Sequence, residues 1–209
     1  RNEYTLTHLA TGEILIAGGA TVIPMSGNAT ELCELYNHTT GAWTTTGSMT
    51  TRRAYHASVL LPDGRVLAIS GATSGLSNIS GTPTASCEIY DPLSGTWAPT
   101  GSLNNARTSH TATLLYNGKV LVTGGLFSVP AELYDPVTGI WTEVDTPGNV
   151  YFQHTATLLP NGEVLIAKAG QSELYNPCTN LFTPTTGTLS AGAGQFKAQA
   201  HLLQNDKVI

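Results

Sequence analysis

The chain has 209 residues and a formal net charge of −5, with 9 lysines and arginines against 14 aspartates and glutamates. An acidic chain without a basic cluster lacks the electrostatic footprint of a nucleic-acid-binding protein, and its apolar runs are too short to cross a bilayer. Hydrophobic residues make up 41% of the sequence, which is enough for a folded domain with a sizeable core. We therefore expect a folded domain, and from the charge and the short apolar runs we expect neither a nucleic-acid partner nor a membrane span.

A block that opens with histidine recurs along the chain. Each copy reads as a segment of small and apolar residues, an Asp-Gly or Asn-Gly pair, and a second apolar segment. Asp-Gly and Asn-Gly are strong hairpin signals because both central residues of the tight turn require positive φ. We therefore expect two antiparallel strands in each of the blocks 56–71, 110–125 and 154–170.

A second block follows each hairpin and adds two more strands. Its Glu-Leu-Tyr or Glu-Ile-Tyr segment ends at a turn, and a late aromatic residue then begins the outer strand. The second strand of each unit, as in 66–69 and 120–122, is apolar throughout and should lie between neighbouring sheets. The tyrosine and the late aromatic residue of each unit are Tyr36 with Trp43, Tyr90 with Trp97, Tyr134 with Trp141, and Tyr175 with Phe182.

A four-stranded sheet with two apolar faces is not stable alone, so each unit must stack on its neighbours. Radial stacking gives a β-propeller of about four to eight blades. Residues 198–209 would supply only a first strand and the start of a second strand, and residues 4–19 already supply these two strands to the first sheet. The last segment therefore cannot complete the first blade, and we expect the chain to be a segment of a six- or seven-bladed propeller. Four full four-stranded blades are predicted at approximately 4–49, 50–103, 104–147 and 148–197, with the start of a fifth at 198–209.

Several features recur in register along almost the whole chain: the late tryptophan, Tyr-Asp-Pro, the doublets Gly18-Gly19 and Gly124-Gly125, and the spacings Arg53-x-x-His56 and Arg107-x-x-His110. With these features the sequence resembles the kelch repeat, and the resemblance implies an all-β, kelch-type β-propeller. Tyr151 and Gln195 stand where that pattern has arginine. Kelch propellers include adaptors, receptors, structural proteins and a few enzymes, so the resemblance says more about fold than about function.

The three cysteines, Cys33, Cys87 and Cys178, form an odd set, which in a secreted chain leaves one thiol free or paired outside this segment. Cys33 and Cys87 occupy the same repeat position, where Ala131 and Ser172 stand in the next units, so we interpret them as small packed side chains. Equivalent points on neighbouring blades usually exceed the ~7 Å Cα separation that a disulfide allows. The sequence leaves the pairing of the three cysteines open.

Three Asn-x-Ser/Thr triplets begin at Asn28, Asn37 and Asn78, each in an expected loop or turn. Such triplets are acceptors for N-glycosylation, and they favour a secreted glycoprotein. A chain rich in Asn, Ser and Thr carries such triplets by chance as well, so a cytoplasmic location remains the alternative.

The loops of an antiparallel blade emerge at two ends. Tight turns take one end, and the long loops 20–31 and 72–86 share the other with the connections 44–54, 98–108 and 142–152. Binding residues concentrate on loops held by a rigid scaffold, so this second end is the expected partner site. Its candidate binding residues are Thr21, Asn28, Thr51, Arg52, Ser77, Asn78, Asn104, Asn105, Asn149 and Tyr151.

Most carboxylates recur with the repeat. We interpret those of the third strands as structural and expect them to pair with Arg53 or Arg107 where these arginines exist. The reason is that a buried carboxylate without a partner costs free energy. The acids that the repeat does not explain offer no evident facing pair of the kind a glycosidase needs. The third-strand acids are Glu34, Glu88, Glu132 and Glu173, and the unexplained ones are Glu3, Glu31, Glu143 and Asp145.

His56, His110 and His154 stand at equivalent places on the innermost strand. A ring of imidazoles could hold a metal, but metal sites need convergent geometry, and we expect these side chains to anchor the loop that enters each blade. Tyr55 resembles the cross-linked tyrosine of copper-radical oxidases similar to galactose oxidase. That resemblance also requires a cysteine within residues 4–10, and none is present. We therefore predict no catalytic residue, metal or cofactor.

The preferred functional prediction is a non-enzymatic, extracellular propeller that serves as a binding or structural assembly module. Its partner would be a protein or a glycan, or a second copy through self-association. Two alternatives remain open at this stage: an intracellular kelch adaptor and a copper-radical oxidase of the galactose-oxidase kind.

Overall fold

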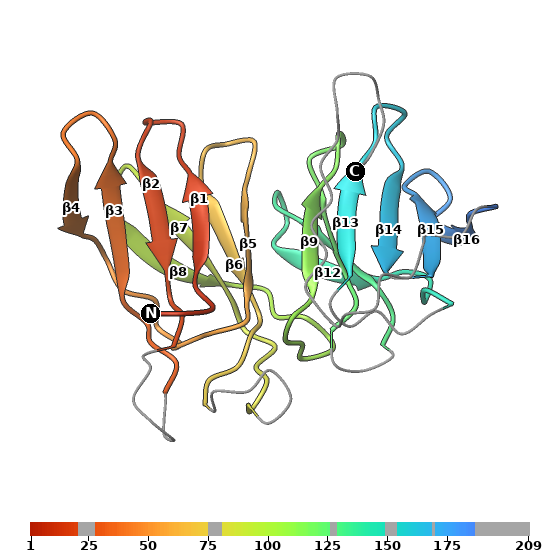
Figure 1. The fold of residues 1–209 in the computed structure, drawn as a ribbon, viewed down its shortest axis with the longest axis horizontal. Coiled ribbons are helices and arrows are strands. Elements are labelled where there is room, and N and C mark those ends of the chain that lie inside the picture. Colours follow the sequence, from red (N-terminus) through yellow and green to blue (C-terminus); the bar gives the residue numbers. More distant parts are fainter. Residues whose placement is uncertain (21–27, 75–80, 126–128, 149–153, 169, 187–209) are drawn as a thin grey trace.

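The computed structural model describes residues 1–20, 28–74, 81–125, 129–148, 154–168 and 170–186. Within these ranges the regular structure consists of four antiparallel four-stranded sheets, here called blades 1 to 4, which confirms the all-β expectation (Figure 1). The predicted fifth blade at 198–209 lies outside the described residues. None of the described segments forms a helix that could span a membrane.

Each blade runs from its innermost first strand to its outermost fourth strand in chain order. Blade 1 contains β1 (Thr5–His8), β2 (Ile14–Ala17), β3 (Cys33–Asn37) and β4 (Ala42–Thr45). Blade 2 contains β5 (Ala57–Leu60), β6 (Val66–Ile69), β7 (Cys87–Asp91) and β8 (Thr96–Thr100). Blade 3 contains β9 (Thr111–Leu114), β10 (Val120–Thr123), β11 (Glu132–Asp135) and β12 (Ile140–Glu143). Blade 4 contains β13 (Thr155–Leu158), β14 (Val164–Lys168), β15 (Gln171–Asn176) and β16 (Leu181–Pro184).

The turn between the first and second strands differs from the tight turn that the sequence led us to expect. In blade 2 the Gly64 amide donates to the Leu61 carbonyl at 3.0 Å, and only Gly64 in the turn has a positive φ, of 87°. Pro62 holds φ near −65°, which suits the second position of a type I turn, and Gly118 closes the same turn after Tyr116, so the turn does not depend on proline. The connection is therefore a type I turn closed by a left-handed glycine, and the prediction of two positive φ values was wrong.

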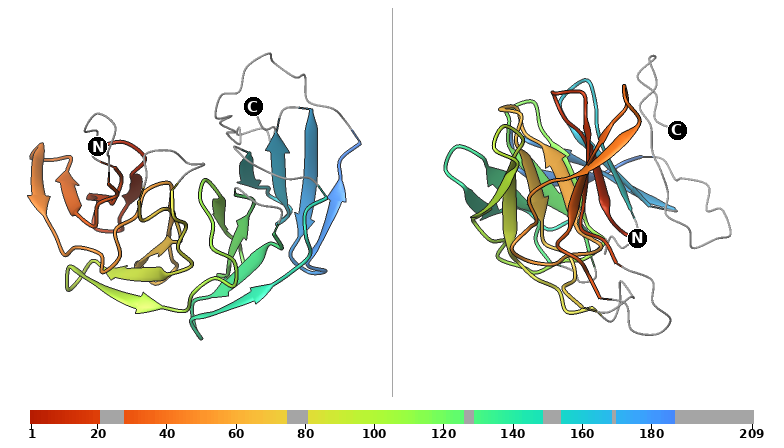
Figure 2. Two further views of the ribbon diagram at one scale, coloured as in Figure 1. Left: turned by 90° about the horizontal axis from the view of Figure 1, so that it is seen from below. Right: turned by 90° about the vertical axis from the view of Figure 1, so that its left-hand side faces the viewer.

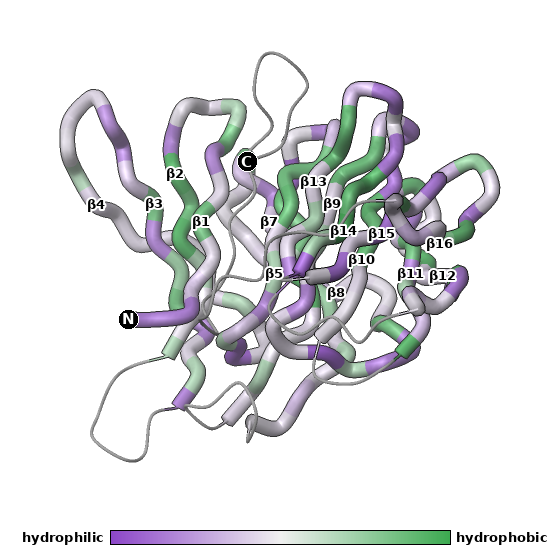
Figure 3. Tube along the Cα trace, turned by 45° about the vertical axis from the view of Figure 1, so that its right-hand side comes forward, coloured by the Kyte–Doolittle hydropathy of each residue, from purple (hydrophilic) through white to green (hydrophobic). Residues whose placement is uncertain are grey.

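Apolar residues on facing sides of successive blades form the core. The side of each blade that faces the preceding blade is here called its leading face. In blade 2 this face consists of Val66, Ala68, Tyr90 and Trp97, which pack against Leu9, Leu15, Ala17, Cys33 and Met49 of blade 1. Equivalent residues make the next two interfaces. Figure 3 shows hydrophobic stretches along strands such as β2 and β14.

The second strands of the two middle blades are the most deeply buried segments. All four residues of β6 and all four of β10 are buried, as expected for central strands between neighbouring sheets. In blade 1 the pattern changes, because Trp43 is 54% exposed while Trp97 and Trp141 at the same repeat position are 9% and 7% exposed. The described blades form an open arc, and the leading face of blade 1 lies at one of its ends (Figure 2).

Candidate binding face

The turns that join first to second and third to fourth strands lie at one end of the blades, here called the hairpin face (Figure 1). The connections from second to third strands and from one blade to the next lie at the other end, here called the loop face. The candidate residues that the structure describes belong to the loop face: Asn28, Thr51, Arg52, Asn104 and Asn105.

A buried carboxylate holds the connection between blades 1 and 2. Glu88 on β7 accepts hydrogen bonds from the Thr50 amide at 2.6 Å, the Thr50 hydroxyl at 2.9 Å and the Thr51 amide at 3.0 Å. It also pairs with the Arg53 guanidinium at 2.7 Å, and the two side chains are 1% and 0% exposed. The ion pair therefore fixes the backbone of the loop face from inside the blade.

Blade 3 repeats this arrangement. Glu132 accepts from the Asn104 amide at 2.7 Å and the Asn105 amide at 3.2 Å, and pairs with Arg107 at 2.9 Å. These contacts confirm that the third-strand glutamates of blades 2 and 3 are structural and pair with Arg53 and Arg107.

Blade 1 contains an equivalent but partly exposed ion pair, with Arg1 17% and Glu34 39% exposed, and its arginine was missed in the sequence. Arg1 pairs with Glu34 and donates to the Leu32 carbonyl at 2.8 Å. The signal was present, because Arg1 and Tyr4 have the spacing of Arg53 and His56. In blade 4 the equivalent carboxylate, Glu173, is also buried.

The structure gives several predicted binding residues an internal role. The Thr51 and Asn105 amides bind the buried carboxylates, and Asn104 uses both its amide and its side-chain Nδ2, the latter at 3.0 Å, on Glu132. Arg52 and Asn28 are exposed on the loop face. The remaining candidates lie outside the described residues: Thr21, Ser77, Asn78, Asn149 and Tyr151.

Three other residues of the loop face have an unusual backbone. Glu3, Tyr55 and Ser109 have φ values of 56°, 53° and 55°, in the left-handed region that non-glycine residues rarely occupy. They are equivalent by repeat, and each lies just before the innermost strand of its blade. The Tyr55 amide donates to the Glu3 carbonyl at 3.2 Å, and the Ser109 amide donates to the Tyr55 carbonyl at 3.0 Å. A backbone chain thus joins three blades at the inner rim of the loop face.

The side chains of these three rim residues differ from blade to blade. The positions around them recur, with an arginine two residues before each one and a histidine or tyrosine directly after it. Burial raises the pKa of Tyr55, and the negative charge of Glu3 raises it further, so these two side chains are electrostatic neighbours. Left-handed residues outside glycine carry strain that persists only where the surroundings enforce it, and such strain often marks ligand sites. Glu3 and Ser109 were not among the residues predicted to bind a partner. What could have indicated them in the sequence is that their repeat position varies in residue type while its neighbours recur.

The inner histidines connect blades. His56 Nε2 lies 3.0 Å from the Thr5 hydroxyl of blade 1, and His154 Nε2 lies 2.8 Å from the Thr111 hydroxyl of blade 3. Burial and the charge of Arg107 lower the pKa of His110 to about 3, so this imidazole is neutral at physiological pH. These contacts of His56 and His154 are with inner strands of the preceding blades, and the role of anchoring the loop that enters each blade stays a prediction. Among the described residues, no group of three potential metal ligands gathers.

The surroundings of Tyr55 do not fit a cross-linked copper site. The neighbouring inner strand, β1, contains no cysteine. Cys33 and Cys87 are buried in third strands, Cys178 is exposed on a turn, and all three are free thiols. Burial raises the pKa of the Cys33 thiol and raises that of Cys87 to about 11, so both behave as packed neutral side chains. We therefore derive no oxidase chemistry from this chain.

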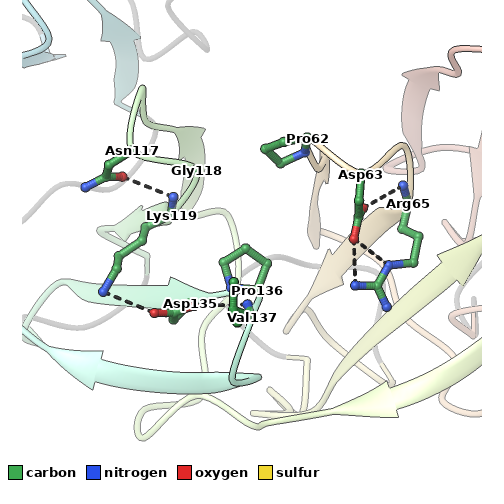
Figure 4. Close-up of a pocket in the computed structure, with 9 residues that line it drawn as sticks. All are labelled: Pro62, Asp63, Arg65, Asn117, Gly118, Lys119, Asp135, Pro136 and Val137. Atoms are coloured by element: carbon green, nitrogen blue, oxygen red, sulfur yellow. Dashed lines mark hydrogen bonds and ion pairs between the residues drawn. The ribbon is translucent and has the colours of Figure 1, made fainter.

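The hairpin face, where we expected tight turns only, contains an open cavity of about 480 Å³ between blades 2 and 3. An ion pair lies on each of its walls, Asp63 with Arg65 at 2.7 Å and Lys119 with Asp135 at 3.3 Å (Figure 4). Because these charges are partly exposed and already paired, they contribute little binding energy.

No protein-family model matches the chain. A galactose oxidase from Gibberella zeae is 31% identical over 96 residues, which are 46% of this chain and 13% of that protein. An F-box/kelch-repeat protein from Arabidopsis thaliana is 30% identical over 54% of this chain and 26% of its own length. A kelch-like protein from Aspergillus terreus is 28% identical over 60% of this chain and 27% of its own length. The matches thus span about an eighth to a quarter of these relatives.

The fold is shared with a solved structure titled "Structure of YjhT". The match has a TM-score of 0.77 at 12% identity and covers 98% of this chain and 75% of that one. At this identity the likeness concerns the fold alone. Together with the repeat and the four sheets, these findings show that the chain is a run of kelch-type β-propeller blades.

Proposed function

We propose that the chain is a binding module that takes a protein partner on its loop face. The observation that carries the proposal is the inner rim, where the left-handed residues Glu3, Tyr55 and Ser109 differ from blade to blade and the side chains of Glu3 and Tyr55 are partly exposed. Buried carboxylates hold the flanking connections, so a partner would meet a preorganised surface and lose little conformational entropy from these loops. Two of the similar proteins are named for kelch repeats rather than for an activity.

Binding also suits the chemistry of this face better than catalysis. His56 and His154 share hydrogen bonds with threonine hydroxyls of adjacent blades, and Glu88 is held by backbone and arginine hydrogen bonds. These groups support the fold, whereas Arg52 is exposed on the loop face beside the partly exposed Tyr55.

Two loop-face variants test this proposal. Tyr55→Asn removes the aromatic ring but keeps a residue that tolerates the left-handed backbone, and Arg52→Glu reverses an exposed charge. Leu93→Ser on the hairpin face, where Leu93 is 93% exposed, is the matched control. We expect proteins that the tagged chain captures from its source to be retained by the control and reduced about tenfold or more by either loop-face change. Capture that ignores both loop-face changes, or a chain that captures only glycans, would contradict a protein partner on this face.

We further propose that the chain is secreted and glycosylated. The Asn37 side-chain oxygen accepts the amides of Thr39 at 2.9 Å and Thr40 at 3.1 Å, which turns its Nδ2 away from these contacts on an exposed turn. Nδ2 is the atom that takes an N-linked glycan. We expect peptides containing Asn37 from the source organism to carry a glycan mass that peptide-N-glycosidase removes. Unmodified Asn28 and Asn37 in all such peptides would favour the intracellular adaptor.

A further inference from the structure

The outermost strand of blade 1 has an open edge. β4 is the last strand of its sheet among the described strands. The Thr46 amide donates to the Cys33 carbonyl at 3.2 Å, and hydrogen bonding alternates along an antiparallel pair, so Thr44 bonds to β3 as well. Thr45 lies between these two residues and Trp43 lies just before Thr44. The N–H and C=O groups of Trp43 and Thr45 therefore point away from β3.

The residue two places after the late aromatic residue occupies this outward-facing position in every blade. Proline lacks an N–H and a charge resists burial, and natural sheets use both to prevent another strand from adding to an edge. Three blades carry such a residue and blade 1 carries a β-branched residue that favours strands. The four residues are Thr45 in blade 1, Pro99 in blade 2, Glu143 in blade 3 and Pro184 in blade 4.

We propose that β4 pairs with β4 of a second copy of this chain, antiparallel and about a twofold axis at Thr44. In this register Trp43 and the second copy's Thr45 exchange hydrogen bonds, and the symmetric pair does the same. Ala42–Thr45 carries no charge, so the two copies do not repel each other across the ladder.

A second copy suits this edge because the pairing is self-complementary. The twofold axis places each Trp43 ring beside the other copy's Thr45, and aromatic and β-branched side chains are favourable cross-strand neighbours. The Trp43 ring already packs on Tyr36, with centroids 4.8 Å apart, so its orientation is set before association. The backbone ladder uses the N–H and C=O groups at the edge of β4, while the Trp43 ring lies on the leading face of blade 1 and adds one side-chain contact beside that ladder.

The contact is small, and we expect weak association that analytical ultracentrifugation detects between about 10 μM and about 1 mM. The wild-type chain should shift from monomer to dimer over this range, and Thr45→Pro should remain monomeric. Thr45→Pro should also fold, because blades 2 and 4 carry proline at the same place. Pro99→Thr should open a second edge and produce species larger than a dimer.

Amide hydrogen exchange locates the contact. In the wild-type chain, exchange at Trp43 and Thr45 should slow as concentration rises, while exchange at Thr44, which already bonds to β3, should not change. A wild-type chain that stays monomeric throughout, or a dimer that persists in Thr45→Pro, would overturn the proposal.

Discussion

Replacing Glu88 with alanine should lower the free energy of unfolding by about 3–5 kcal/mol, because the change leaves the Arg53 guanidinium buried without its counter-charge. Arg53, whose side chain is 0% exposed, would keep its hydrogen bonds to the Ser70 and Ser86 carbonyls, both 2.8 Å, but would lose the carboxylate that balances its charge. Urea denaturation followed by far-ultraviolet circular dichroism measures this loss.

Two controls separate the buried charge from a general effect of substitution. Glu143→Ala changes an exposed carboxylate and should alter stability by less than about 0.5 kcal/mol. Replacing both partners by apolar residues, Arg53→Met with Glu88→Leu, should recover the part of the loss that comes from the buried charge, while the Thr50 and Thr51 amides still lack their acceptor. A cost below about 1 kcal/mol for Glu88→Ala would show that water reaches the ion pair in solution.

The same carboxylate gives stability a dependence on pH. Burial alone would raise the pKa of Glu88, but the hydrogen bonds from Thr50, Arg53 and Thr51 outweigh burial and lower the pKa below its usual value. Its contribution is therefore complete above the unfolded pKa of about 4.3 and is lost as the pH falls through the lower folded value. Glu88→Ala should flatten this acid limb.

A second large effect is expected at the interface between blades 2 and 3. Trp141 is part of the apolar cluster there and donates its indole N–H to the Gly101 carbonyl at 2.9 Å. Trp141→Ala should lower the free energy of unfolding by about 3–5 kcal/mol, since it removes a large buried side chain and leaves a cavity. Trp43→Ala, at the same repeat position on a face that no described blade covers, should cost less than about 1 kcal/mol in this chain.

Most of the blade architecture could be predicted because it is encoded locally. The apolar runs at 66–69 and 120–122 fold as central strands, and the late tryptophans begin outer strands as expected. The turn after Leu61 was misjudged because an Asp-Gly or Asn-Gly pair also fits a type I turn closed by a left-handed glycine, which is the turn that forms at Gly12, Gly64 and Gly118.

The candidate site was harder to predict because it depends on contacts between blades. The left-handed backbone of Tyr55 is held by the Glu3 carbonyl, a residue 52 positions earlier, and no local sequence signal at a tyrosine indicates positive φ. Asn104 was a reasonable surface candidate by residue type, but its side chain lies against Glu132 of the following third strand. Long-range hydrogen bonds of this kind become visible only after the blades are stacked.

Each of blades 2 to 4 is stabilised by the blade before it, which covers its leading face. Unfolding free energies of Trp43→Ala, Trp97→Ala and Trp141→Ala, measured side by side, show whether this cover matters. We expect large and similar losses at Trp97 and Trp141, which are 9% and 7% exposed, and a small loss at Trp43, which is 54% exposed. Equal losses at all three positions, or the largest loss at Trp43, would contradict this expectation.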